Sequence, residues 1–195
     1  MLANIGYGLG NASQQGMIPV SRLAISSISD PAVVVKYGLI SQCLIAVQVL
    51  AVPLSTVLMS GGKEGFKAVA VELLSRKANI FVAMSVIFSS VGVYCALAVF
   101  GLIDFDKLSL IALLVISFCL AVGNLQSILF VQFSMAGRLL FGNVFALLML
   151  IAPFCYFQLD IYSSLFVVSI AYIVRVFMHA IFLVSRDAKS APKIG

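Results

Sequence analysis

The sequence predicts an all-α membrane protein, a bundle of six transmembrane helices with both termini in the cytoplasm. Its composition, the spacing of its apolar segments and the placement of its basic residues predict this class. Of the 195 residues, 63% are hydrophobic and only 10% are charged, whereas a soluble domain carries about 25% charged residues. So few charges cannot cover a globule with a solvated surface, and the same composition excludes a disordered chain.

Six apolar segments account for most of the chain. A helix needs about 20 apolar residues to cross the hydrocarbon core of a bilayer, so six crossings leave room only for short loops and a tail. The predicted spans cover residues about 2–25, 33–59, 80–103, 108–133, 140–157 and 161–184. Residues 1–185 thus form one predicted bundle, and residues 186–195 form a polar cytoplasmic tail.

The breaks between the segments contain residues that end helices. The first segment is only weakly apolar, and it ends before Asp30-Pro31 because the residue that precedes a proline avoids the helical conformation. The second segment ends at Ser60-Gly61-Gly62, where glycine permits a helix cap and a turn. Short turns at residues 104–107, 135–138 and 158–160 separate the remaining segments.

The segment at residues 63–77 differs from the spans on either side of it. Its charged residues alternate with Phe66, Val69, Val71 and Leu74. This pattern predicts an amphipathic helix that lies along the cytoplasmic surface of the membrane.

The basic residues predict the orientation of the bundle. Those on one side are Lys63, Lys67, Arg76, Lys77, Arg138, Arg186, Lys189 and Lys193. On the other side the basic residues are Arg22, Lys36 and Lys107. Because cytoplasmic loops carry an excess of Lys and Arg, the first side is the cytoplasmic one, and an even number of spans places both termini there.

Arg175 is the clearest candidate functional residue, because it falls near the middle of the sixth span. It lies about ten residues from the cytoplasmic end, roughly 15 Å along a helix, and a central arginine costs about 2.5–3.5 kcal/mol on the insertion scale. All 7 acidic residues fall in loops or at the ends of spans. Three interpretations therefore stay open: a wet cavity that receives an anion, a partner on another chain, or a structural arginine bonded to main-chain carbonyls and water.

Two further candidates share the helix face of Arg175. Tyr172 lies three residues before it and His179 four residues after it, which are the spacings of neighbours on a helix surface. His179 is the single histidine of the chain and has an ordinary pKa near neutral pH. It is a candidate for proton coupling, and the competing interpretation is a hydrogen-bonded structural residue.

The first span carries a second polar stripe. Asn11, Gln15 and Arg22 fall on one helix face, and Pro19 is expected to kink the helix because it removes a main-chain hydrogen bond. This stripe is either the wall of a moving cavity or a surface for close helix packing through small residues such as Gly10. Three other intramembrane amides are candidates for cavity donors or for hydrogen bonds between helices: Asn124, Gln132 and Asn143.

Other function classes lack the residues that they need. One histidine and no intramembrane acid leave no set for acid–base or metal catalysis, so we expect no enzyme activity, no metal site and no cofactor. The basic residues do not cluster with aromatic residues, which argues against nucleic-acid binding. We expect the four cysteines to be buried small apolar residues rather than disulfides: Cys43, Cys95, Cys119 and Cys155.

The chain resembles the N-terminal half of bacterial polysaccharide (O-antigen-type) flippases of the multidrug/oligosaccharidyl-lipid/polysaccharide exporter superfamily. The resemblance lies in the polar first span leading to Arg22-Leu23, in Tyr37-Gly38, in the amphipathic segment at residues 63–77, and in Ala136-Gly137-Arg138. It implies about twelve spans in two six-span bundles, and alternating access that moves a lipid-diphosphate-linked oligosaccharide across the cell inner membrane. It also implies a cationic cavity for the diphosphate and sugar, with Arg22 and Arg175 as the matching residues.

Two alternatives to a flippase remain. One is a dimeric six-span carrier or channel for another anionic or drug-like solute, and the other is a membrane scaffold that transports nothing. The expected partners are the lipid bilayer, the lipid-linked oligosaccharide, and a second six-span half or a second copy of the chain. Six spans against about twelve predict a truncated product, half of a split transporter, or a half that forms a homodimer.

Overall fold

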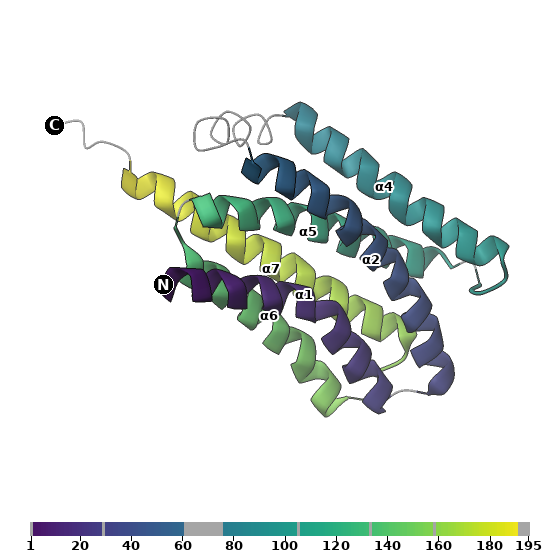
Figure 1. Ribbon diagram of the computed structural model, residues 1–195. Helices are drawn as coiled ribbons and strands as arrows, with labels where there is room; N and C mark the ends of the chain where they lie inside the picture. The colour runs from purple at the N-terminus through teal and green to yellow at the C-terminus, as the bar shows by residue number, and fades with distance from the viewer. Residues whose placement is uncertain are drawn as a thin grey trace.

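The computed structural model describes residues 2–28, 30–60, 76–104, 106–132, 134–157 and 159–190. These residues form helices and the turns between them, and no strand occurs in this part of the chain. The helices are α1 (Leu2–Ile28), α2 (Pro31–Ser60), α4 (Arg76–Val99), α5 (Lys107–Gln132), α6 (Ala136–Tyr156) and α7 (Ile161–Ser190) (Figure 1). The predicted all-α class is therefore confirmed.

Three of these helices are long and apolar enough to cross a membrane. Their apolar stretches are Lys107–Asn124 in α5, Ala136–Tyr156 in α6 and Ile161–Ser185 in α7. Pro31–Ile45 in α2 and Phe88–Val99 in α4 are apolar over shorter lengths. These lengths and compositions indicate a membrane protein, while the number of six spans stays a prediction.

The helix boundaries differ from the predicted spans at several ends. α1 extends to Ile28, α4 begins at Arg76, and α6 begins at Ala136, so most of the turn predicted at residues 135–138 is helical. The third predicted span runs to residue 103, but α4 ends at Val99 because the chain turns at Gly101, whose φ of 68° is in the left-handed region that glycine favours. The predicted polar tail begins at residue 186, but α7 continues as a helix to Ser190. Most of the predicted amphipathic segment, residues 63–75, and the tail after Ser190 lie outside the described residues.

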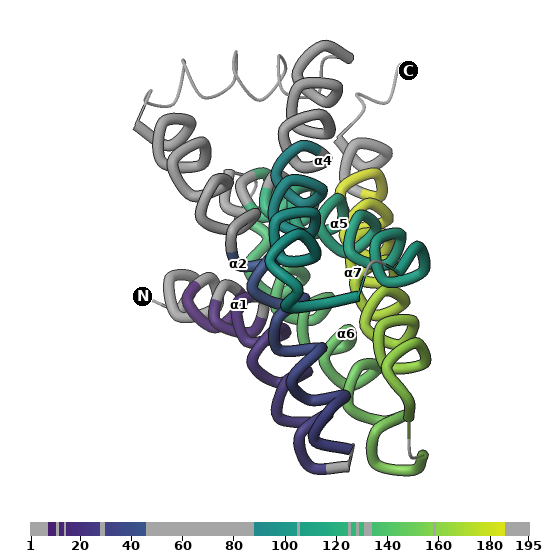
Figure 2. The backbone as a smooth tube through the Cα atoms, turned by 90° about the vertical axis from the view of Figure 1, so that its right-hand side faces the viewer, coloured from purple at the N-terminus to yellow at the C-terminus, as the bar shows by residue number. Residues whose placement is uncertain are grey.

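Five helices close into a ring around a common core. In the described part of the chain α1 contacts α2 and α6, α2 contacts α5, and α7 packs between α5 and α6. α4 lies outside this ring, against α2 and α5 (Figures 1 and 2). The beginning of α1 and the end of α7 lie toward the same end of the bundle, and the axis of α1, which contains Pro19, bends along its length (Figure 1).

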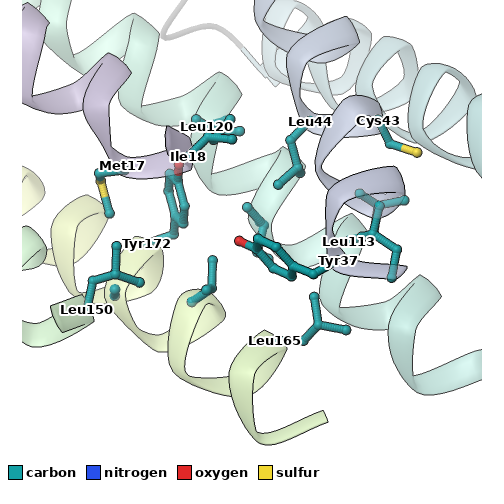
Figure 3. Close-up of a cluster of buried hydrophobic side chains, with 14 of the residues drawn as sticks. Met17, Ile18, Tyr37, Cys43, Leu44, Leu113, Leu120, Leu150, Leu165 and Tyr172 are labelled. Carbon is teal, nitrogen blue, oxygen red and sulfur yellow. The ribbon is translucent and has the colours of Figure 1, made fainter. Parts of the chain in front are cut away.

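The core draws on every helix of the ring. Tyr37 and Tyr172 are among its largest fully buried side chains. Figure 3 shows both tyrosines within one apolar cluster. Other members from the five helices are Met17, Ile18, Leu44, Leu113, Leu120, Leu150 and Leu165. Burial of these side chains supplies the packing that holds the ring together.

Acidic residues form the caps at one end of the bundle. A carboxylate oxygen of Asp30 accepts a hydrogen bond of 2.9 Å from the main-chain N–H of Ala32. Asp106 accepts one of 2.9 Å from the N–H of Ser109. Asp160 accepts one of 2.8 Å from the N–H of Ser163. These carboxylates satisfy main-chain N–H groups in the first turns of α2, α5 and α7 and complement the helix dipoles. The prediction that acids fall at the helix ends is confirmed for these residues.

Candidate functional site

The predicted polar stripe on α7 exists as a buried face. Tyr172, Arg175 and His179 point into the bundle, and each side chain is 0% exposed. Their spacing of three and four residues keeps them on one side of the helix, which is the side packed against α5 and α6. The structure therefore brings together three of the six predicted site residues.

The guanidinium of Arg175 packs against the main chain of α5 at Gly123. A Cβ atom built on Gly123 would lie 2.5 Å from Nη2 of Arg175 and 2.8 Å from its Cζ, so only glycine leaves room for the guanidinium here. Nε, Nη1 and Nη2 of Arg175 are all buried, and none has a hydrogen-bond partner among the described residues.

No carboxylate in the described ranges forms an ion pair with this arginine. The described acids with defined side chains lie near the helix ends, where Asp30, Asp106 and Asp160 already cap helices. A buried charge without a partner is costly, which leaves Arg175 with unused capacity to bind an anion. Tyr172 adds a buried hydroxyl that also lacks a hydrogen-bond partner.

His179 has similar surroundings one helical turn away. Its ring meets Phe130 edge to face, with 4.9 Å between ring centroids, and a Cβ on Gly142 of α6 would lie 2.6 Å from Nε2. Neither ring nitrogen makes a hydrogen bond to the part of the chain that is described. The prediction of proton coupling at His179 stays a prediction.

Arg22 lies apart from the α7 stripe, between α1 and α2. Its Nε donates a hydrogen bond of 2.6 Å to Ser41 Oγ, while its Nη2 is buried and without a partner in the described chain. Next to it, the hydroxyls of Ser21 and Tyr37 are 2.7 Å apart and hydrogen-bonded. The two arginines that the family resemblance singles out thus occupy different helix interfaces.

The rest of the predicted α1 stripe does not join this group. Gln15 has an exposed side chain, and the side chain of Asn11 lies outside the described residues. Gly10 instead makes a close helix contact: its carbonyl accepts a hydrogen bond of 2.8 Å from Asn143 Nδ2 on α6, and its position for a Cβ is 3.1 Å from Leu139. The interpretation of Gly10 and Asn143 as helix-packing residues is confirmed.

The other predicted polar residues and the cysteines have mixed environments. Asn124 is partly buried and makes an interaction, whereas the side chain of Gln132 lies outside the described residues. Cys43 and Cys119 are buried as expected, but Cys95 is only partly buried and Cys155 is exposed.

The described surface hollows do not reach the α7 stripe. One groove of about 530 Å³ lies where α2 begins beside the α4–α5 turn and includes Val35, Lys36, Leu102 and Asp104. Another of about 410 Å³ is lined by Ser134, Met135, Gly137 and Arg138. With Arg175 and His179 fully buried, the stripe is sealed in this conformation.

The fold and the site define a class, an α-helical protein with three helices suited to a membrane and a sealed cationic centre. Comparison with known proteins adds no family to this class. No protein-family model, curated protein or solved structure matches the chain.

Sequence reasoning missed the residues that face the stripe from other helices. Gly123 and Gly142 fall inside apolar runs, and nothing in their own segments marks them. Gln126 of α5 was also missed, and its Nε2 donates a hydrogen bond of 3.1 Å to the carbonyl of Val176 on α7. Glycines inside other helices, such as Gly16 and Gly92, have open space instead, so a glycine within a span does not by itself point to such a contact.

Proposed function

We propose that the chain is a membrane transporter for an anionic, lipid-linked substrate, and specifically half of a flippase for lipid-diphosphate-linked oligosaccharide in the cell inner membrane. One observation carries the proposal: a buried arginine with three unpartnered nitrogens and no carboxylate near it in the described residues. A phosphate-bearing ligand supplies the charge-assisted hydrogen bonds that this arginine lacks.

The proposed topology uses the described helices as six spans. α1, α2, α4, α5, α6 and α7 are 21 to 30 residues long, or about 30 to 45 Å at 1.5 Å per residue. The Asp-capped ends then face the periplasm, and Arg138 with the start of α1 and the end of α7 faces the cytoplasm. This assignment follows the excess of basic residues on the cytoplasmic side.

Transport through this bundle requires helix movement, because the α7 stripe is sealed. The α5–α7 and α6–α7 interfaces cover Arg175 and His179, so the separation of α7 from one of these neighbours exposes them. The conformation described here is then the closed state of an alternating-access cycle, and the specific substrate rests on the family resemblance.

The experiment that tests the proposal is complementation of a strain without an O-polysaccharide flippase. The chain is expressed alone and together with a C-terminal six-span flippase half, and O-polysaccharide at the cell surface is measured. When the C-terminal half is present, we expect display to be restored by the wild-type chain, lost in Arg175→Leu, and retained in the matched control Arg138→Leu. The amount of each variant in the membrane fraction is measured in parallel.

The other outcomes identify the alternatives. Absence of display with both co-expressed halves present in the membrane contradicts the flippase. Anion uptake into proteoliposomes by the wild-type chain, and not by Arg175→Leu, then favours a carrier or channel. If the wild-type chain supports neither display nor uptake, the scaffold is favoured. If Arg175→Leu keeps the activity of the wild-type chain, the arginine is structural.

A further inference from the structure

Two glycines on two different helices face the two basic side chains of α7. A Cβ on Gly123 would come within 2.5 Å of the Arg175 guanidinium, and a Cβ on Gly142 within 2.6 Å of the His179 ring. Of the described glycines, these two are the ones at which a Cβ would come closer than 3.0 Å to a neighbouring atom. Gly8, Gly16, Gly38, Gly92 and Gly137 have open space at the same position.

The contacts of these two glycines differ from ordinary glycine packing between membrane helices. Small residues there usually allow two backbones to approach each other. At Gly123 and Gly142, however, the nearest atoms belong to the polar ends of long side chains. The missing Cβ atoms thus create two recesses, one on α5 and one on α6, each filled by an unpartnered polar group of α7.

The two recesses act on the same helix. Arg175 and His179 are four residues apart and share one face of α7, so their recesses on α5 and α6 together restrict the rotation of α7 about its axis. Neither recess offers a hydrogen bond to the group that fills it. The two side chains are therefore held there by shape and packing, although movement of α7 away from α5 also breaks the hydrogen bond from Gln126 Nε2 to the Val176 carbonyl.

We infer that Gly123 and Gly142 are positioning residues that hold α7 in its sealed orientation and thereby keep Arg175 away from water. The filled recesses define the closed state, and movement of α7 out of them makes the arginine accessible. The importance of this movement for transport rests on the proposed function, but the inference itself concerns the position of α7. It is therefore tested without any transport measurement.

Cys119 provides a reporter for water access at this place. It lies on α5 one turn before Gly123 and is 6% exposed. In a chain with Cys43, Cys95 and Cys155 replaced by serine, the rate of Cys119 modification by a water-soluble maleimide is measured in membranes. We expect Gly123→Ala and Gly142→Ala each to raise this rate about fivefold or more, because a minor open state starts from a population of about 0.1–10%.

The matched control is Gly38→Ala, at a partly buried glycine of α2 with open space around it. We expect the control to label at the parental rate. An unchanged rate in either Gly123→Ala or Gly142→Ala overturns the inference, and so does an equal rise in Gly38→Ala.

Paired substitutions test whether the effect of each glycine variant comes from the side chain that fills its recess or from general helix packing. Arg175→Lys keeps the charge but removes Nη2, the atom nearest the position of a Cβ on Gly123, and its flexible stem lets the single ammonium move away from that Cβ. It should therefore return the labelling rate of Gly123→Ala to that of Arg175→Lys alone. His179→Ala should do the same for Gly142→Ala and should not rescue Gly123→Ala. Such selective rescue is the sign of direct coupling between the paired residues.

A failure of Gly123→Ala to fold also tests the inference. If Gly123→Ala is absent from the membrane in both the Arg175 and the Arg175→Lys backgrounds, the glycine serves backbone packing and the inference is wrong. If transport is absent but the selective rescue occurs, the position of α7 is established and the proposed function fails alone.

Discussion

The capping carboxylates at the Asp-capped end of the bundle have hydrogen-bond partners, whereas the charged side chain at its buried centre has none among the described residues. At the capped end, Asp30, Asp106 and Asp160 each accept a main-chain hydrogen bond of 2.8 to 2.9 Å and remain close to solvent. At the centre, Arg175 is fully enclosed and none of its nitrogens has a partner among the described residues. The difference indicates that the capping charges serve the fold, whereas the central charge is kept at the expense of stability.

The largest expected effect is a gain of stability on removal of the central charge. We expect Arg175→Leu to raise the free energy of unfolding by about 3 kcal/mol, since it removes the insertion cost of a central arginine. Denaturant titration in detergent micelles measures this change. The matched variant Arg22→Leu should lower stability by about 1 kcal/mol, because Arg22 loses its hydrogen bond to Ser41. Equal losses of stability in both variants would contradict the claim that the central charge of Arg175 destabilises the fold.

A smaller loss is expected at the capped end. Asp106→Ala removes the acceptor for the N–H groups of Leu108 and Ser109, so the free energy of unfolding should fall by about 1 kcal/mol. The control is Asp104→Ala, because the exposed Asp104 lies outside α5 and leaves these N–H groups in place. Equal effects of the two variants would show that the cap contributes nothing.

The hydrogen bond between α1 and α6 should contribute less to the free energy of unfolding than the Asp106 cap does. Asn143→Leu removes the hydrogen bond to the carbonyl of Gly10, and hydrogen bonds between membrane helices average about 0.6 kcal/mol. Unfolding titrations should show a loss of this size. A loss above about 2 kcal/mol would contradict this assignment and would make Asn143 more important for the fold than the Asp106 cap.

The smallest effect concerns pH. The nearby Ser109 hydroxyl, followed by the main-chain N–H groups of Ser109 and Leu108, lowers the pKa of Asp106 below its ordinary value. Its stabilising contribution is therefore complete above the ordinary pKa of about 3.9 and disappears as the pH falls through the lowered pKa. We expect Asp106→Asn to reduce the acid-induced loss of stability by about 0.3 kcal/mol, which thermal unfolding between pH 6 and 3 measures. An identical pH profile in the variant would contradict this origin.

Local sequence signals predicted the helices and the ends of most of them. Apolar length predicted helices where α5, α6 and α7 lie, and the i, i+3 and i+4 spacing predicted that Tyr172, Arg175 and His179 share a face. The same length criterion extended α4 too far, because Phe100 to Ile103 are as apolar as the helix and only the φ of Gly101 shows the turn.

The neighbours of the stripe were beyond the reach of local signals. Gly123 and Arg175 are far apart in the chain, and their contact depends on how α5 packs against α7. Helical spacing placed Gln15 and Arg22 on one face of α1 but did not specify how that face meets its neighbours, so Gln15 is exposed while Arg22 contacts Ser41.

The bond between Asn143 and Gly10 also has a consequence for the order of events during synthesis. The two residues are separated by 133 positions, so at about 5 to 20 residues per second the ribosome needs roughly 7 to 27 seconds to make Asn143 after Gly10. α2, α4 and α5 are made in that interval. α1 therefore acquires its main packing partner, α6, only after these three helices have been made, and its final position depends on chain that does not yet exist when α1 is made.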